Sequence, residues 1–274
     1  MKTHLLTTAV VAMLAAFLTL ASQMPANADL ASGYPTVVFS DNFSSGTDAL
    51  WTHLSAFAAS SGQTWNASTG AYEMTAPANG YNPGNGKYGF VGSVVTSVPA
   101  FGNGYVQSDV VTWQGNGVFG AWGLGARLNN LNAILGLTGY AFVYEPYGNT
   151  YTGDIRLERL GPPSIFNSLA ALNVTLTPGN QYTLTLETAG SSIIGSIWNV
   201  GQVGVSLVGS VSAIDATYAS GSVGLFAVTQ QPIPTVDVTF DNFLVAVPEP
   251  GTVVLVGLGL VGIIARRRFG SRRD

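Results

Sequence analysis

Acidic side chains are the first residues of this chain to test for chemistry, because two carboxylates on one strand face can flank a glycosidic bond. A retaining hydrolase needs its two carboxyl groups about 5–5.5 Å apart, and alternate residues of a strand share one face. The glutamates between the N-terminal apolar segment and residue 247 are Glu73, Glu145, Glu158 and Glu187, and none has a second carboxylate two positions away. Asp154 and Glu158 would share a face, but about 13 Å of strand separates them. The spacing predicts no catalytic carboxylate pair.

Nucleophilic and metal-dependent chemistry also lack their usual residues. The chain has no cysteine, which excludes disulfides, a lipid-modified N-terminal cysteine and cysteine-based metal sites. His53 is the one histidine outside the N-terminal segment, and no serine lies in a Gly-any-Ser-any-Gly turn. Metal catalysis through histidine would need more than one such ligand. We therefore expect a protein that is not an enzyme.

Aromatic and amide side chains are better candidates for function. Rings offer flat apolar faces with a polar edge, and amides offer both donors and acceptors. Tyr81 and Asn82 lie in one Gly/Asn-rich segment, and Tyr147, Asn149 and Tyr151 lie in another. Both segments separate runs of β-forming residues, where sandwich proteins display ligands. These five residues are the predicted carbohydrate-binding surface.

The elements that must position these side chains are predicted to be strands. Glycine, Val, Thr, Tyr, Ser and Asn are frequent, and runs of helix-forming residues are few outside the two terminal segments. Thirteen segments combine β-forming residues with flanking turn signals: 36–39, 63–65, 71–74, 89–95, 104–113, 119–128, 139–144, 154–160, 172–176, 181–187, 193–199, 222–228 and 236–245. So many short strands in one domain predict a two-sheet sandwich.

Local patterns refine this expectation. Thr177-Pro178-Gly179-Asn180 has the Pro and Gly positions of a type II turn, and 189–192 is typical of a hairpin connection. Segment 181–187 alternates Thr with Tyr and Leu, which predicts one buried and one wetted face. Trp113, Trp122 and Trp198 fall on strands, so we expect their rings to fill the core.

Several short segments resemble the strands of concanavalin A-like lectin/glucanase sandwiches. They are Phe39-Ser40-Asp41-Asn42-Phe43 followed by Trp51, then 123–127, 155–160, 177–187 and 195–199, and finally 221–226 and 238–245. The resemblance spans nearly all of the chain between the terminal segments and implies an antiparallel jelly roll. Glucanases of this fold carry Glu-any-Asp-any-any-Glu on one strand, and this chain has no such motif. The resemblance therefore implies binding rather than hydrolysis.

A metal ion is a further expectation from this resemblance. The first and last strands of such a jelly roll are neighbours, which would bring Asp41 and Asp241 together. Family members often carry a structural ion there, and carboxylate oxygens are the ligands that calcium prefers. No cofactor is expected to be required, and the alternative is that both aspartates cap turns.

The C-terminus resembles the PEP-CTERM sorting tail. Val247-Pro248-Glu249-Pro250 precedes an uncharged apolar run at 251–265, and five of the ten basic residues lie in the last nine positions, beginning with Arg266, Arg267 and Arg268. Such an arginine cluster keeps the end of a membrane segment in the cytoplasm. The resemblance implies an exosortase-type enzyme that removes the tail, and the alternative is a plain single-pass anchor.

The N-terminus carries a matching export signal. Lys2 and His4 precede an apolar stretch, and Ala26-Asn27-Ala28 fits signal peptidase. We expect a signal peptide at 1–28, a sandwich domain at 29–246 and a sorting tail at 247–274. The domain would face the periplasm while the tail is held in the inner membrane, and it would then reach the cell surface or the medium.

Charge and composition limit the partners of the exported part. Residues 29–247 carry four basic and twelve acidic side chains, a net charge of −8, so nucleic acid is an improbable partner. The predicted role is carbohydrate binding, associated with exopolysaccharide or biofilm. The alternatives are a structural or adhesive matrix protein, a glycoside hydrolase, and an ice-binding protein, which would need repeated Thr-any-Thr ladders that the sequence lacks.

Overall fold

The computed structural model describes most of the region expected to form the sandwich. The described residues are 30–31, 33–54, 63–76, 89–98, 100–113, 118–132, 136–148, 151–162, 165–200, 204–229 and 235–249. The expected signal peptide and the apolar tail helix lie outside these residues. Within the described ranges, no helix is long and apolar enough to cross a membrane.

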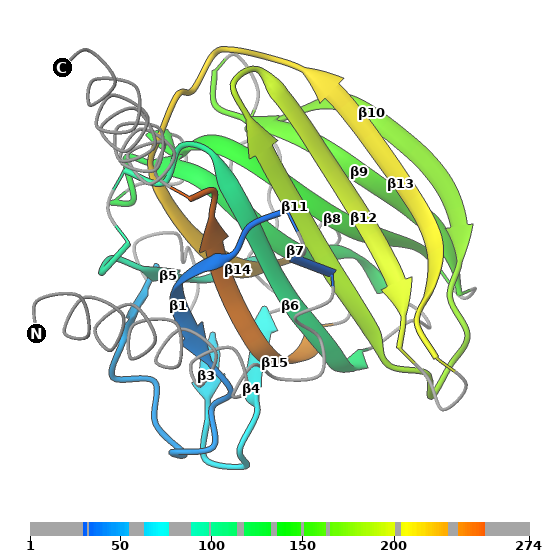
Figure 1. Ribbon diagram of the computed structural model, residues 1–274. Coiled ribbons are helices and arrows are strands. Elements are labelled where there is room, and N and C mark those ends of the chain that lie inside the picture. The colour runs from blue at the N-terminus through cyan, green and yellow to red at the C-terminus, as the bar shows by residue number, and fades with distance from the viewer. Residues whose placement is uncertain are drawn as a thin grey trace, which may run out of the picture.

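Strands are the main secondary structure of the described residues, as the sequence predicts (Figure 1). The strands are β1 Thr36–Asp41, β2 Trp51–His53, β3 Thr64–Asn66, β4 Tyr72–Ala76, β5 Gly89–Val95, β6 Gly104–Trp113, β7 Val118–Asn129, β8 Thr138–Gly148, β9 Thr152–Leu160, β10 Phe166–Thr175, β11 Tyr182–Ala189, β12 Ser192–Asn199, β13 Ser206–Ile214, β14 Ser222–Thr229 and β15 Val236–Val247.

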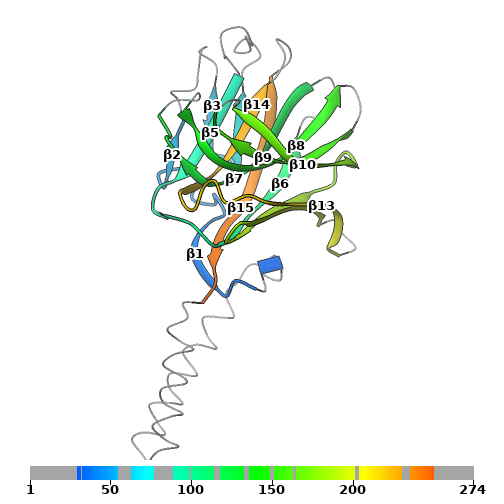
Figure 2. The ribbon, with the colours of Figure 1, turned by 90° about the horizontal axis from the view of Figure 1, so that it is seen from above.

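Two antiparallel sheets form the sandwich. The eight-stranded sheet has the order β13-β12-β11-β6-β15-β4-β3, and β1 pairs with the second half of β15. The seven-stranded sheet has the order β10-β9-β8-β7-β14-β5-β2. Because strands distant in sequence are neighbours in both sheets, this is the predicted jelly-roll arrangement. Figure 2 shows β1 and the C-terminal end of β15 together at one end of the sandwich.

The core lies between the two sheets, where alternate residues of each strand meet. Phe142, Tyr144 and Leu184 are fully buried there. A second apolar cluster lies on the other face of the seven-stranded sheet, since Val143 alternates with Phe142 and Tyr144 along β8 and packs with Phe226. Both faces of this sheet are therefore partly apolar.

Local turn chemistry agrees with the sequence. The amide of Asn180 donates to the carbonyl of Thr177 at 3.2 Å, and Gly179 has φ +79°, as the type II turn requires. Gly190, at φ +59°, turns the chain between β11 and β12 in the expected hairpin. Only glycine adopts such backbone angles without strain.

Three expectations about strands were wrong in detail. The prediction omitted β2 and β13, a three-residue strand and an edge strand whose small alternating residues give a weak signal. The outer face of β11, expected to face solvent, is instead covered, because Thr183 and Thr185 are nearly fully buried. Thr183 donates to Asp109, and the indole N–H of Trp198 donates to Thr185. Polar side chains on neighbouring strands cover this face of β11. The local alternation of residues does not show these partners.

Candidate ligand-binding site

One end of the sandwich gathers the ends of strands from both sheets. Trp113 ends β6 of the eight-stranded sheet, and its ring lies 5.9 Å from Trp122 and 5.8 Å from Tyr144 of the seven-stranded sheet. Tyr151 lies between β8 and β9 and contacts Trp113 edge to face at 5.6 Å. We call this the aromatic end. It is opposite to the end where β15 finishes, because β6 and β15 are antiparallel.

Two of the five predicted binding residues lie at the aromatic end. Tyr147, near the end of β8, has 39% of its surface exposed, and Tyr151 is half-buried with its carbonyl accepting a 2.7 Å hydrogen bond from Tyr144. Tyr81, Asn82 and Asn149 lie outside the described residues, so their part in the site stays a prediction.

A polar cluster on neighbouring strands lies beside Tyr147. Glu145 of β8 and Asp154 of β9 are directly opposite in register. The guanidinium of Arg156 lies 2.9 Å from Glu145 and 3.1 Å from Asp154, and the hydroxyl of Tyr147 donates to Asp154. Burial lowers the pKa of Arg156, but Tyr147, Glu145 and Asp154 outweigh it and raise that pKa above its usual value. The cation is therefore held in place between the two carboxylates.

Sequence spacing did not indicate this cluster. The pairing joins residues nine positions apart through strand register, which the spacing of carboxylates along one strand does not reveal. Trp113 packs against the core, as its place on a strand predicts, but it is only partly buried at the end of β6. The signal that could have found the cluster is the alternation of Asp154, Arg156 and Glu158 along one strand.

Two buried carboxylate oxygens at this face have no hydrogen-bond partner among the residues that the structure describes. Asp154 and Glu158 are 6% and 5% exposed, and the unpaired atoms are Asp154 Oδ1 and Glu158 Oε2. Burial raises the pKa of Glu158 to about 7; Arg156 lowers it and Glu145 raises it further. Unpaired buried acceptors are costly, and neither atom has appreciable exposed surface in this structure.

The other tryptophans have separate places. Trp122 is fully buried in the core, as predicted. The prediction that Trp198 fills the core was wrong, because Trp198 follows the core residue Ile197 and therefore points to the outer face of β12. Trp65 stacks on His53 at 4.4 Å and donates to the carbonyl of Gly92. The side chains of Trp65 and His53 thus have structural partners.

The two aspartates expected to hold calcium do come close together. Asp41 pairs with Phe243, two residues from Asp241, and burial raises the pKa of Asp241, with Asp109 and Asp41 adding to that rise. The carboxylate of Asp41 accepts from the amide of Phe43 at 2.8 Å and from the indole N–H of Trp51 at 2.9 Å. In the described ranges, no three His, Cys, Asp or Glu side chains form a metal-binding group. Calcium at this pair stays a prediction.

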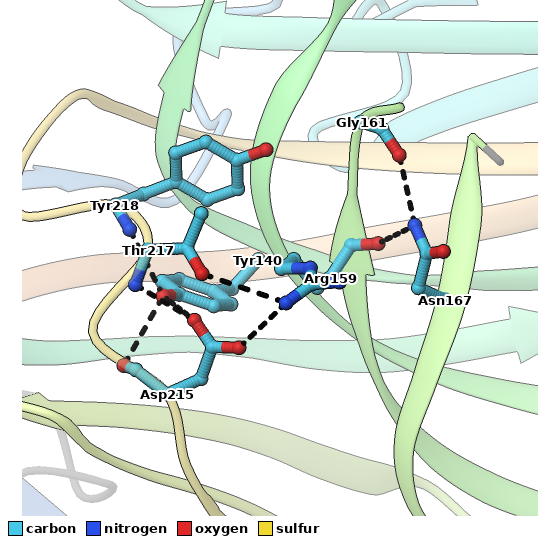
Figure 3. A network of polar contacts seen from close by, with 7 residues as sticks. All are labelled: Tyr140, Arg159, Gly161, Asn167, Asp215, Thr217 and Tyr218. Carbon is cyan, nitrogen blue, oxygen red and sulfur yellow. Dashed lines mark hydrogen bonds and ion pairs between the residues drawn. The ribbon is translucent and has the colours of Figure 1, made fainter. Parts of the chain in front are cut away.

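A second polar network lies at the opposite end of the sandwich (Figure 3). Tyr140 of β8 and Arg159 of β9 both reach Asp215, at 2.6 Å and 3.1 Å, and Asp215 also accepts from the amide of Thr217. Asn167 donates to the carbonyl of Arg159 and joins β10 to the same network. These contacts fasten the segment before β14 onto the seven-stranded sheet.

Comparison with known proteins gives a sorting motif and a fold. The family model for the PEP-CTERM protein-sorting motif matches residues 246–268. No curated protein matches the chain. Among solved structures, the catalytic domain of an endo-1,3-β-glucanase (laminarinase) from Thermotoga petrophila RKU-1 is similar with 14% identity and a TM-score of 0.51, covering 78% of this chain and 98% of that one.

Two further solved structures show the same fold without catalysis in their descriptions. Lectin UEA-II complexed with galactose has 10% identity and a TM-score of 0.51 over 77% of this chain and 99% of that chain. The CBM2 module of the evolved Dit of Lactobacillus casei BL23 phage J-1 has 8% identity and a TM-score of 0.52 over 77% and 94%. The chain thus joins a jelly-roll sandwich to a PEP-CTERM sorting motif, which directs export to the cell surface or beyond and implies processing by an exosortase-type enzyme.

Proposed function

We propose that the protein is an exported, non-catalytic carbohydrate-binding module that binds its ligand at the aromatic end. The observation that carries this proposal is exposed Tyr147 beside the cluster of Glu145, Asp154 and Arg156 on the outer face of the seven-stranded sheet. Half-buried Tyr151 lies at the same end of the sandwich and contacts Trp113. Rings supply stacking faces, while the partly exposed guanidinium of Arg156 can donate to sugar hydroxyl groups. Tyr81, Asn82 and Asn149 belong to the same proposal through chain connectivity, and extracellular polysaccharide is the proposed ligand.

The test uses recombinant residues 29–249, which keep β15 whole and lack the apolar run. Binding to a glycan array and to insoluble polysaccharides is compared between the native domain, Tyr147→Ala and Tyr151→Ala. We expect saturable binding that each variant weakens about tenfold, equivalent to about 1.4 kcal/mol. The matched control is Tyr34→Ala, which removes a half-buried tyrosine at the opposite end and should leave binding unchanged.

The absence of binding to every glycan would instead favour a structural or adhesive matrix protein. A link to exopolysaccharide or biofilm would then rest on the sorting motif alone. Equal loss in Tyr34→Ala and Tyr147→Ala would contradict the assignment of the site to the aromatic end.

A glycoside hydrolase is the second candidate, and one observation favours it. Glu145 and Asp154 are a cross-strand pair, whose Cβ atoms are typically about 5 Å apart, in the range that retaining enzymes use. Against this, Arg156 bridges both carboxylates. Release of reducing sugar from laminarin that is lost in Glu145→Gln would favour the hydrolase.

A further inference from the structure

The sorting motif begins inside the folded domain. The motif matches from residue 246, and β15 continues through Ala246 and Val247. Ala246 is fully buried and pairs with Tyr105 on one side and Val37 on the other, while Val247 pairs with Thr36. No free chain therefore separates the sheet from Pro248.

The distance from this strand to the apolar run of the tail is short. Val247 is four residues from Gly251, where the uncharged run starts. An extended chain covers at most about 3.6 Å per residue, so the end of β15 lies within about 14 Å of that run. Pro248 and Pro250 fix their own φ angles and keep their neighbours extended, which limits folding back.

The surface beside the end of β15 carries exposed valines and an uncharged hollow, and the exposed Glu249 follows the strand. Val37 and Val38 are 37% and 44% exposed, and a β-bulge at this point of β1 interrupts its pairing with β15. Beside them is a hollow of about 480 Å³, lined by residues that include Val98, Phe101 and Val247. None of the described residues that line this hollow is charged. We call this surface the tail-side base.

We propose that the tail-side base faces the bilayer surface and contacts the lipid headgroups while the tail is in place, and that the short junction after Val247 imposes this orientation. The inference rests on the proposed export of the module, with its tail held in the membrane before processing, as the tail sequence predicts. A twelve-residue strand such as β15 is roughly 40 Å long. Tyr147 and Tyr151 are therefore held away from the membrane, toward material outside it.

Two observations fit a lipid surface as the occupant of the base. The apolar run and the arginine cluster that follow Val247 place a membrane within chain reach. The described lining of the hollow can approach the headgroup layer without desolvation of a charge, and Val37 and Val38 offer apolar side chains to the interface.

The experiment uses the mature full chain, residues 29–274, in vesicles of phosphatidylethanolamine and phosphatidylglycerol. The chain has no cysteine, so Val38→Cys and Thr177→Cys each provide one label site. Thr177 begins the turn before β11 at the aromatic end, and serves as the matched control. Fluorescence quenching by headgroup-attached nitroxide lipids is measured at each position, and vesicle flotation reports membrane association. Thermal unfolding checks that both labelled proteins are folded.

We expect strong quenching at position 38 and none at position 177. Inserting twelve Gly and Ser residues between Val247 and Pro248 should then weaken the quenching at 38, because a flexible linker of that length spans about 20 Å. Equal quenching at both positions, or unchanged quenching after the insertion, would overturn the imposed orientation. A chain that does not float with vesicles would overturn the proposal and its membrane stage while leaving glycan binding to be judged separately.

Discussion

The hydroxyl of Tyr140 donates a 2.6 Å hydrogen bond to the carboxylate of Asp215, and this bond ties the middle of the chain to the segment before β14. Burial alone would raise the pKa of Asp215, but hydrogen bonds from Thr217, Tyr140 and Arg159 outweigh it and lower that pKa to about 2. The charged form of Asp215 therefore stabilises the fold.

We expect acid to remove this contribution. A carboxyl group with a lowered pKa stabilises the folded state fully above its unfolded pKa of 3.8, and the stabilisation is lost as the pH falls toward about 2. Urea unfolding followed by tryptophan fluorescence between pH 2 and pH 7 should show a loss of about 1 to 2 kcal/mol in this window. Asp215→Asn should reduce that loss. An unchanged pH profile in Asp215→Asn would contradict the role of this carboxylate.

Glu158 should have the opposite dependence on pH. Its pKa is raised to about 7 by burial, so the folded state holds a proton that the unfolded state releases above 4.5. Stability is therefore expected to fall as the pH rises from 4.5 through 7, by about 2 to 3 kcal/mol. Glu158→Gln cannot release this proton and should be more stable than the native domain at pH 8 while changing little at pH 4. A lower stability of Glu158→Gln at both pH values would contradict the raised pKa.

Arg127 should be essential to the fold although it is far from the aromatic end. It is 1% exposed, and its guanidinium donates to the carbonyls of Gly102, Gly190 and Tyr218. Arg127→Met would remove the guanidinium from the carbonyls of Gly190 and Tyr218, while the Gly102 carbonyl would keep its hydrogen bond from Thr188, and we expect a loss of about 2 to 4 kcal/mol, measured by urea unfolding. Arg127→Lys should recover part of it. A loss below about 1 kcal/mol in Arg127→Met would show that water replaces the guanidinium.

Asp41 should be important whether or not an ion is bound. Asp41→Ala removes the acceptor of the Phe43 amide and the Trp51 indole N–H, at a cost of about 1 to 3 kcal/mol. Both carboxylate oxygens of Asp41 already accept hydrogen bonds, and if these aspartates only cap turns, calcium will leave the Tm of the native domain unchanged. A rise in Tm with calcium that is absent in Asp241→Asn would instead establish the ion at this pair.

The sequence by itself determined the strand-rich class, the sorting tail and several turns. β5 and β6 have the predicted bounds because their β-forming residues lie between clear turn signals. Gly179 has the positive φ angle that a type II turn requires at its third position. The motif at 246–268 is contiguous, so it needs no fold to be recognised.

Only the tertiary structure decided what lies together. The pairing of Glu145 with Asp154 depends on strand register, which local sequence does not encode. Trp198 faces outward and Thr183 is buried for the same reason, since neighbouring strands supply their contacts. The structure also placed Ala246 and Val247 within β15, because β1 and β6 provide the backbone partners that extend the strand into the sorting motif.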